Sequence, residues 1–552
     1  MPSRPERSEQ NCVAEWSFSS KKEYADPFGE VEVSAVFDDP DGEEKTVPLF
    51  WASGSLWRVR YASDRLGEHR FQTVCSDESN EGLHGQEGSL EVVPYSGHNP
   101  LLKHGPLRIS NDRRYLEHAD GKPFFWLGDT WWMSLCKRLS WEGFKMLTKD
   151  RVKKGFTVIQ IVSGLYPDMP PFDPRGANEA GFPWDESYTQ INPAYFDMAD
   201  RRIDWLVQNG LVPCIVGSWG FFIEFAGEQA MKKHWRNLVA RYGAYPLVWC
   251  IAGEATMPYY LTPFFGSQDE KAKEYVARTR TRWTTIARFI RSTDPYHHPM
   301  TIHAAPVSHL VDDPSLIDIE MLGGLSHGYD PEALSRTVDT FVESNLRRPR
   351  MPFLVGEGCY EGISGACWEN IQRLAFWTSI LNGACGHTYG ANGIWQLNSQ
   401  TEPYGPSPYG PSRSHDIIPW EEAYQLPGSK QVGLGRDLLE RYQWWKFEPY
   451  PEWVEPRWSK EDYYKPYAAG IPEEVRIVYL PQSWSSLQKV KGIEGGVTYH
   501  AFYYDPRNGR EYDVGTVVPD EKGEWQPPVP PIFQDFILVM EARSQTPIDP
   551  QR

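Results

Sequence analysis

The chain has 552 residues, with 74 acidic side chains against 56 Lys and Arg, giving a formal net charge of −18. A chain of this length exceeds one compact core, so two or three domains are expected. The acidic balance, without any basic run, argues against nucleic acid as a partner. No stretch approaches the length of a membrane span, and no apolar leader opens the sequence. We therefore expect a cytoplasmic protein that binds neither nucleic acid nor membrane, and the sequence leaves a homo-oligomer open.

The eight cysteines include no Cys-x-x-Cys pair. Cys214, Cys250 and Cys385 lie inside apolar, strand-like runs. This placement is typical of small buried residues that stay reduced, so we expect eight free thiols.

Residues 13–93 have the pattern of short β-strands. Apolar and polar residues alternate at 31–37 and 56–61, and clusters of turn-forming residues occupy 38–42 and 76–80. This rhythm predicts an N-terminal β-sandwich over residues 1–97.

Beyond residue 98, short apolar runs alternate with helix-length segments. The strands are expected at 124–129, 156–162, 211–216, 247–253, 300–303, 317–321, 353–356 and 384–389, and the helices at 141–154, 194–209, 228–242, 271–291, 331–347, 368–381 and 430–444. The order predicts an α/β fold with a (β/α)₈ TIM barrel over residues 98–455. An open, doubly wound sheet is the alternative. Neither Gly-x-Gly-x-x-Gly nor a P-loop supports that alternative, and we expect no cofactor.

The last part of the chain again has the sequence pattern of β-strands. Runs at 475–480, 497–504 and 533–539 are rich in β-branched and aromatic residues. A C-terminal β-sandwich domain is therefore predicted over residues 456–552.

Two expected barrel strands end on the same dipeptide, Gly-Glu. Residues 246–254 read Pro-Leu-Val-Trp-Cys-Ile-Ala-Gly-Glu, and residues 352–357 read Pro-Phe-Leu-Val-Gly-Glu. Barrels place function at the C-terminal ends of their strands, and a pair of carboxylates there is what a glycosidase uses. Glu254 and Glu357 are thus the candidate catalytic residues. Their structural alternative is a pair of rim carboxylates bonded to neighbouring loops.

The other expected strand ends are polar and aromatic. Indole rings suit the C–H faces of sugars, although each could equally belong to the core, and Asp129 could cap the next helix. The candidate substrate-binding residues are Asp129, Trp131, Trp219, His303, His327, Tyr329, Tyr389, Asn392 and Trp395.

Other catalytic designs lack their sequence signatures. The histidines are scattered, without His-x-His or another tight ligand spacing, so no catalytic metal is expected. A Gly-x-Ser-x-Gly nucleophile elbow is also absent from the sequence.

Four strand ends resemble the apiosidase-like family of glycoside hydrolases. They are Phe-Trp-Leu-Gly-Asp-Thr-Trp at 125–131, Val-Trp-Cys-Ile-Ala-Gly-Glu at 248–254, Phe-Leu-Val-Gly-Glu at 353–357 and Gly-His-Thr-Tyr-Gly-Ala-Asn-Gly-Ile-Trp at 386–395. The resemblance implies a barrel similar to clan A between two β-domains. It implies that Glu254 is the acid/base and Glu357 the nucleophile.

The chain departs from this resemblance at two positions. Members of the family often carry Asp where this chain has Glu254, and clan A enzymes usually carry Asn where it has Gly253. The longer Glu254 reaches further, so we expect a different accepted sugar. Another strand end must then bind the hydroxyl next to the anomeric carbon.

Together these features predict an exo-acting, retaining glycosidase that cleaves a terminal sugar from a carbohydrate substrate through two glutamates. Two alternatives stay open from the sequence. One is an inverting glycosidase on the same barrel, and the other is a non-catalytic carbohydrate-binding protein.

Overall fold

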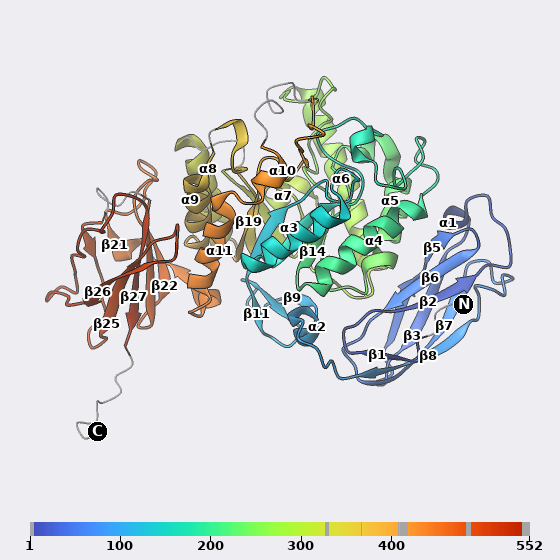
Figure 1. Cartoon of the computed structure of the whole chain (residues 1–552), viewed down its shortest axis with the longest axis horizontal. Helices are drawn as coiled ribbons and strands as arrows, with labels where there is room; N and C mark the ends of the chain where they lie inside the picture. The colour runs from blue at the N-terminus through green and yellow to red at the C-terminus, as the bar shows by residue number, and fades with distance from the viewer. Residues whose placement is uncertain are drawn as a thin grey trace.

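The computed structural model describes residues 5–325, 331–365, 367–406, 408, 418–481 and 487–543. Figure 1 shows three parts in a row: an N-terminal β-domain, a central barrel with its helices, and a C-terminal β-domain. Within the described residues, no helix is both long and apolar enough to cross a bilayer.

The N-terminal domain is a β-sandwich, as expected. A five-stranded sheet in the order β1-β8-β7-β3-β4 faces a three-stranded sheet in the order β2-β6-β5. Phe37 and Tyr61 stack at 3.9 Å between centroids, and Trp16 packs against Phe37, because alternate residues of both sheets face inward. The elements are β1 Arg7–Glu9, β2 Ala14–Ser19, α1 Pro27–Glu30, β3 Val33–Asp38, β4 Glu44–Pro48, β5 Phe50–Ser53, β6 Leu56–Tyr61, β7 Gly67–Cys75 and β8 Glu87–Val93.

A closed barrel of eight parallel strands forms the centre of the molecule. Its order, β12-β13-β14-β15-β16-β17-β18-β19, follows the sequence and confirms the predicted (β/α)₈ fold. The strands are β12 Trp126–Thr130, β13 Val158–Val162, β14 Val212–Val216, β15 Val248–Cys250, β16 Met300–Ile302, β17 Ile319–Gly324, β18 Phe353–Gly358 and β19 Gly386–Tyr389. Almost every strand residue is buried, because helices cover the outside of the barrel and side chains fill its inside.

Helices connect the strands and close the outer layer. They are α3 Trp141–Lys153, α4 Pro193–Gln208, α5 Phe222–Tyr242, α6 Glu270–Thr293, α7 Val307–Leu310, α8 Pro331–Leu346, α9 Glu369–Ile380, α10 Trp420–Ala423 and α11 Pro427–Leu439. Ser140 caps α3 and Asp269 caps α6 through side-chain oxygens that accept backbone N–H groups. A short helix, α2 Pro100–His104, and a small sheet of β9 Leu107–Ile109, β10 Leu116–His118 and β11 Pro123–Phe124 lead into the barrel.

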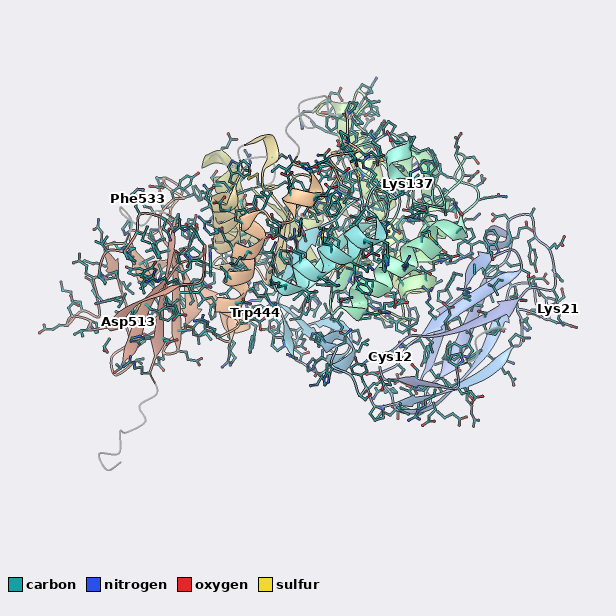
Figure 2. All side chains as sticks on the ribbon, in the orientation of Figure 1. Cys12, Lys21, Lys137, Trp444, Asp513 and Phe533 are labelled. Atoms are coloured by element: carbon teal, nitrogen blue, oxygen red, sulfur yellow. A yellow bond between two sulfur atoms is a disulfide. The ribbon has the colours of Figure 1, made fainter. Side chains whose placement is uncertain are left out.

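The C-terminal domain is β-structure, as predicted. Its six-stranded sheet has the order β20-β22-β23-β27-β25-β26, and β21 pairs with β24. The strands are β20 Glu448–Pro449, β21 Val454–Glu455, β22 Tyr467–Ile471, β23 Val475–Leu480, β24 Lys489–Val490, β25 Tyr499–Tyr504, β26 Glu511–Thr516 and β27 Phe536–Ala542. Figure 2 labels Trp444 near the end of α11, where its ring meets Phe125 of the barrel edge-on at 4.8 Å.

Each flanking domain is joined to the barrel by a buried arginine–aspartate pair. Arg60 of β6 contacts Asp200 of α4 at 2.5 Å. On the other side, Arg373 of α9 donates two hydrogen bonds to Asp535, at 2.7 and 2.8 Å. Such paired geometry satisfies charges that would otherwise be costly to bury.

The expectation of eight free thiols is wrong for two cysteines. Cys359 and Cys367 form a disulfide, and the six other cysteines are free. The chain turns back after β18, which brings their Cα atoms to 6.7 Å although the sequence shows no paired spacing. The cysteines therefore do not support the expected cytoplasmic location.

Candidate active site

A pocket opens where six barrel strands end. It encloses about 570 Å³ of space, counted to its open mouth. The strand ends and loops after β12, β13, β14, β15, β18 and β19 contribute its walls. The lining residues are Trp132, Pro167, Asp168, Trp219, Glu254, Tyr260, Glu357, Tyr360, Ile363, Asn392 and Trp395. Five residues expected in the site, namely both glutamates, Trp219, Asn392 and Trp395, are therefore brought together.

Glu254 lies four residues beyond the end of β15. Its φ of 43° is left-handed, a conformation that costs energy for a residue with a side chain and that is found most often at functional sites. The Trp219 Nε1–H group donates to Oε2 of Glu254 at 3.0 Å. The Glu254 side chain is partly exposed to the pocket. The carboxyl group is therefore oriented by a neutral donor while it stays accessible from the pocket.

Glu357 lies inside β18 and is more deeply buried, with 7% of its surface exposed. Its Oε1 accepts a hydrogen bond from the Tyr360 hydroxyl, and its Oε2 lies 3.2 Å from Nε2 of His303. An ionised carboxylate only accepts hydrogen bonds, so Nε2 must carry the imidazole proton when it bonds to Glu357. Two donors thus favour the charged form of this glutamate.

Tyr360 connects Glu357 to the indole of Trp132, which follows β12. The Trp132 Nε1–H group donates to the Tyr360 oxygen at 2.7 Å, so the phenol proton is directed to Glu357. Burial, and next the negative charge of Glu357, raise the pKa of Tyr360 well above its usual value. The hydroxyl therefore keeps its proton at neutral pH and can donate it to Glu357.

Four residues expected to touch the substrate do not line the pocket, namely His303, Asp129, Trp131 and Tyr389. Asp129 is fully buried; its Oδ2 accepts from Trp131 Nε1 at 2.7 Å and from Arg151 Nε at 2.6 Å. Trp131 is fully buried as well, and Tyr389 donates its hydroxyl to Glu361 at 2.5 Å. Trp132 lines the pocket, whereas the adjacent Trp131 faces away from the pocket.

Glu361 is a further buried glutamate that does not line the pocket. It is fully buried, and it accepts hydrogen bonds from the Tyr389 hydroxyl and, at 3.0 Å, from the N–H of Gly428 in the first turn of α11. Burial raises its pKa to about 7, although both hydrogen bonds act in the opposite direction. Burial lowers the pKa of nearby Arg151, but the Asp129 carboxylate outweighs it and keeps the guanidinium charged.

Asp168 is a pocket residue that the sequence reasoning missed. Its N–H donates to the Tyr260 hydroxyl at 2.8 Å, and its carbonyl oxygen accepts from the Tyr404 hydroxyl at 3.0 Å. Its φ of 58° is left-handed, so two loops hold it in a strained conformation. The signal in the sequence was a Pro-Asp pair, Pro167-Asp168, shortly after the second barrel strand.

Tyr260, Tyr360 and Ile363 also line the pocket and were missed, because they follow strand ends at distances that only the loop conformations determine. His303 does not line it, but contacts Glu357 from behind. His327 and Tyr329 lie outside the described residues. In the part of the chain that the structure describes, no group of three or more His, Cys, Asp or Glu side chains could hold a metal ion.

The apiosidase-like catalytic domain matches residues 110–446 of the sequence, which include the whole barrel. The chain belongs to the apiosidase-like family. The barrel with its pocket is accordingly that of a glycoside hydrolase with a fold similar to clan A. A domain of unknown function called DUF5060 matches residues 8–76 of the N-terminal sandwich. A search of curated proteins found no match.

Solved structures of other proteins share this fold. A structure described as a glycoside hydrolase has a TM-score of 0.65 at 21% identity and covers 82% of this chain and 99% of its own. A putative glycoside hydrolase from Bacteroides vulgatus has a TM-score of 0.69 at 16% identity, with 98% and 100% covered. A family 5 glycoside hydrolase from the same organism has a TM-score of 0.64 at 20% identity, with 81% and 95% covered. At these identities the likeness concerns the fold.

Proposed function

We propose that the protein is a retaining, exo-acting glycosidase in which Glu357 is the nucleophile and Glu254 the acid/base. The observation that carries this proposal is the unequal environment of two glutamates in one pocket. Glu357 is buried and accepts from Tyr360 and His303, whereas Glu254 accepts from the neutral indole of Trp219 and is partly exposed. A nucleophile must be ionised before reaction, and a general acid must hold its proton.

The reaction would proceed in two displacements. In the first, an oxygen of Glu357 attacks the anomeric carbon while the bond to the leaving oxygen breaks and that oxygen takes the proton of Glu254. In the second, Glu254 removes a proton from water, the water oxygen attacks the anomeric carbon, and Glu357 leaves as a carboxylate. Each bond that forms at the anomeric carbon inverts it once, so the configuration is retained.

The size and walls of the pocket support exo cleavage of a terminal sugar. Its space of about 570 Å³, counted to the open mouth, is bounded by side chains from six strand ends, which favours a single terminal sugar over a long chain. Trp395 supplies an aromatic wall, Asp168 a carboxylate, and Asn392 an amide whose Oδ1 already accepts from Gln396 at 2.9 Å. We assign sugar binding to these three residues, in place of Asp129, Trp131 and Tyr389.

Trapping of the intermediate tests the assignment. A 2-fluoro glycoside with a good leaving group destabilises the oxocarbenium-like state, so a covalent adduct should accumulate and mass spectrometry should locate it on Glu357. A panel of nitrophenyl glycosides identifies the sugar first, and NMR of the first-formed product gives its anomeric configuration. A label on Glu254, or an inverted product, would refute the proposal.

A further inference from the structure

Trp219 joins the ends of two neighbouring strands. Beyond the last pairs of β14 and β15, Trp219 forms a parallel bridge with Gly253. The N–H of Gly253 donates to the Ser218 carbonyl at 3.0 Å, and the N–H of Gly220 donates to the Gly253 carbonyl at 2.7 Å. The backbone that carries Glu254 is thus fixed to the backbone that carries the indole.

The Trp219 ring leaves little surface for a sugar to stack on. Its relative exposure is 3%. A Cβ atom on Gly253 would lie 2.3 Å from Cε3 and Cζ3 of the indole, so the six-membered ring covers the Gly253 backbone. Trp132 and His303 pack against the same indole, at 5.5 and 5.9 Å between ring centroids. A stacking platform needs an open face, and this indole is enclosed by neighbours.

We propose that Trp219 is the positioning residue of the acid/base, because its N–H group donates to Oε2 of Glu254 and holds the carboxyl group at the pocket wall. An indole N–H can donate a hydrogen bond and cannot accept one. The indole therefore takes no proton in the reaction and acts by holding the carboxyl group of Glu254 in place. This inference rests on the proposed roles of the two glutamates.

The same hydrogen bond changes in strength during the reaction. When the proton passes from Glu254 to the leaving oxygen, Glu254 becomes a carboxylate and its bond with the indole becomes charge-assisted. When water later returns a proton to Glu254, the bond weakens again. Trp219 therefore stabilises the state that follows proton donation, and Gly253 must lack a side chain so that the indole can lie in this place.

The test is Trp219→Phe, which keeps an aromatic ring and removes the N–H group. Without the donor, Glu254 should hold its proton more tightly, so the basic limb of the kcat/KM profile should move up by about one pH unit. For a substrate with a poor leaving group, kcat should fall by roughly tenfold, with KM little changed. The other titratable groups of the pocket, Asp168, Tyr260, Glu357 and Tyr360, with His303 behind it, are unaltered.

Two further variants separate positioning from packing. Gly253→Ala keeps the indole but places a Cβ atom against it, so it should displace the ring and move the basic limb in the same direction. Trp131→Phe is the matched control, because it also removes an indole N–H that bonds to a carboxylate, but outside the pocket. It should leave the basic limb in place. An unmoved basic limb in Trp219→Phe with a raised KM would show a stacking role instead.

A measurement without substrate distinguishes failure of this inference from failure of the proposed function. The carboxyl stretching band of Glu254, identified by infrared difference against Glu254→Gln, should titrate at higher pH in Trp219→Phe. If the band shifts while the wild type hydrolyses no glycoside, the positioning stands and the proposed reaction fails. If the band titrates identically in both proteins, the positioning role is refuted.

Discussion

Glu254 follows β15 and Glu357 lies within β18, and the two carboxyl groups are held in different ways. β15 stops at Cys250, and the backbone of residues 251–254 leaves the strand and reaches a left-handed φ at Glu254. β18 continues to Gly358, so the Glu357 backbone stays in the sheet. One carboxyl group meets a neutral indole at the pocket wall, and the other meets a phenol and an imidazole in the interior. Proton donation requires access and a changeable charge, whereas nucleophilic attack requires a fixed, ionised oxygen.

The contrast between the two glutamates would be wrong if replacing either one had the same effect on the kinetics. We expect Glu357→Gln to lose about 10⁴-fold or more in kcat/KM on every substrate, because no nucleophile remains. Glu254→Gln should lose about 10²- to 10⁴-fold on a poor leaving group and far less in the first step on a dinitrophenyl glycoside, which needs little protonation. Rates across leaving groups of graded acidity provide the measurement. An equal loss on all leaving groups for both variants would contradict the assignment.

The second prediction concerns Asp129, a carboxylate that, unlike Glu254 and Glu357, does not face the pocket. Asp129→Asn leaves the buried Arg151 without its charged partner, so we expect the free energy of unfolding to fall by about 3 kcal/mol or more. Urea denaturation measures this change. The control is Glu142→Gln on the exposed face of α3, which should stay within about 0.5 kcal/mol. Lost activity at unchanged stability would instead return Asp129 to the substrate.

Glu361 adds a third glutamate, four residues beyond Glu357 and outside the pocket. Its pKa rises from 4.5 to about 7 on burial, so the folded protein holds a proton that the unfolded chain releases between these values. Its contribution to stability is therefore present at low pH and is lost as the pH rises through about 7, by about 3 kcal/mol in total. Glu361→Gln should remove this pH dependence. The difference in free energy of unfolding, variant minus wild type, should therefore be more positive at pH 8 than at pH 5. Denaturation at both values tests it, and parallel curves would contradict it.

The smallest expected effect concerns the hydrogen bonds of Glu357. Tyr360→Phe removes one of its donors and should lower kcat/KM by roughly tenfold. Because the lost bond favours the ionised form, the acidic limb of the profile should move to higher pH while the basic limb stays. This is the opposite limb from that expected for Trp219→Phe. A shift of the basic limb in Tyr360→Phe would show that the two environments are not independent.

The sequence by itself determined the barrel, its eight strands and the two β-domains. Burial on both faces makes each parallel strand a short apolar run, and this local pattern survives in any tertiary context. The positions of Glu254 and Glu357 at one rim followed from the same rule, because parallel strands end together. Trp219, Asn392 and Trp395 line the pocket at this rim, and their contact with substrate stays a prediction.

Only the tertiary structure decided which side chains of the rim face the pocket. Trp131 and Trp132 are adjacent and chemically alike, yet the first bonds to Asp129 and the second to Tyr360. Asp129 itself finds Arg151, a partner 22 residues away on α3, and so becomes part of the interior. Asp168 enters the pocket because hydroxyls of two distant tyrosines hold its loop. The Cys359–Cys367 disulfide likewise depends on a turn. Such contacts depend on loop conformations and long-range pairing, which local periodicity does not encode.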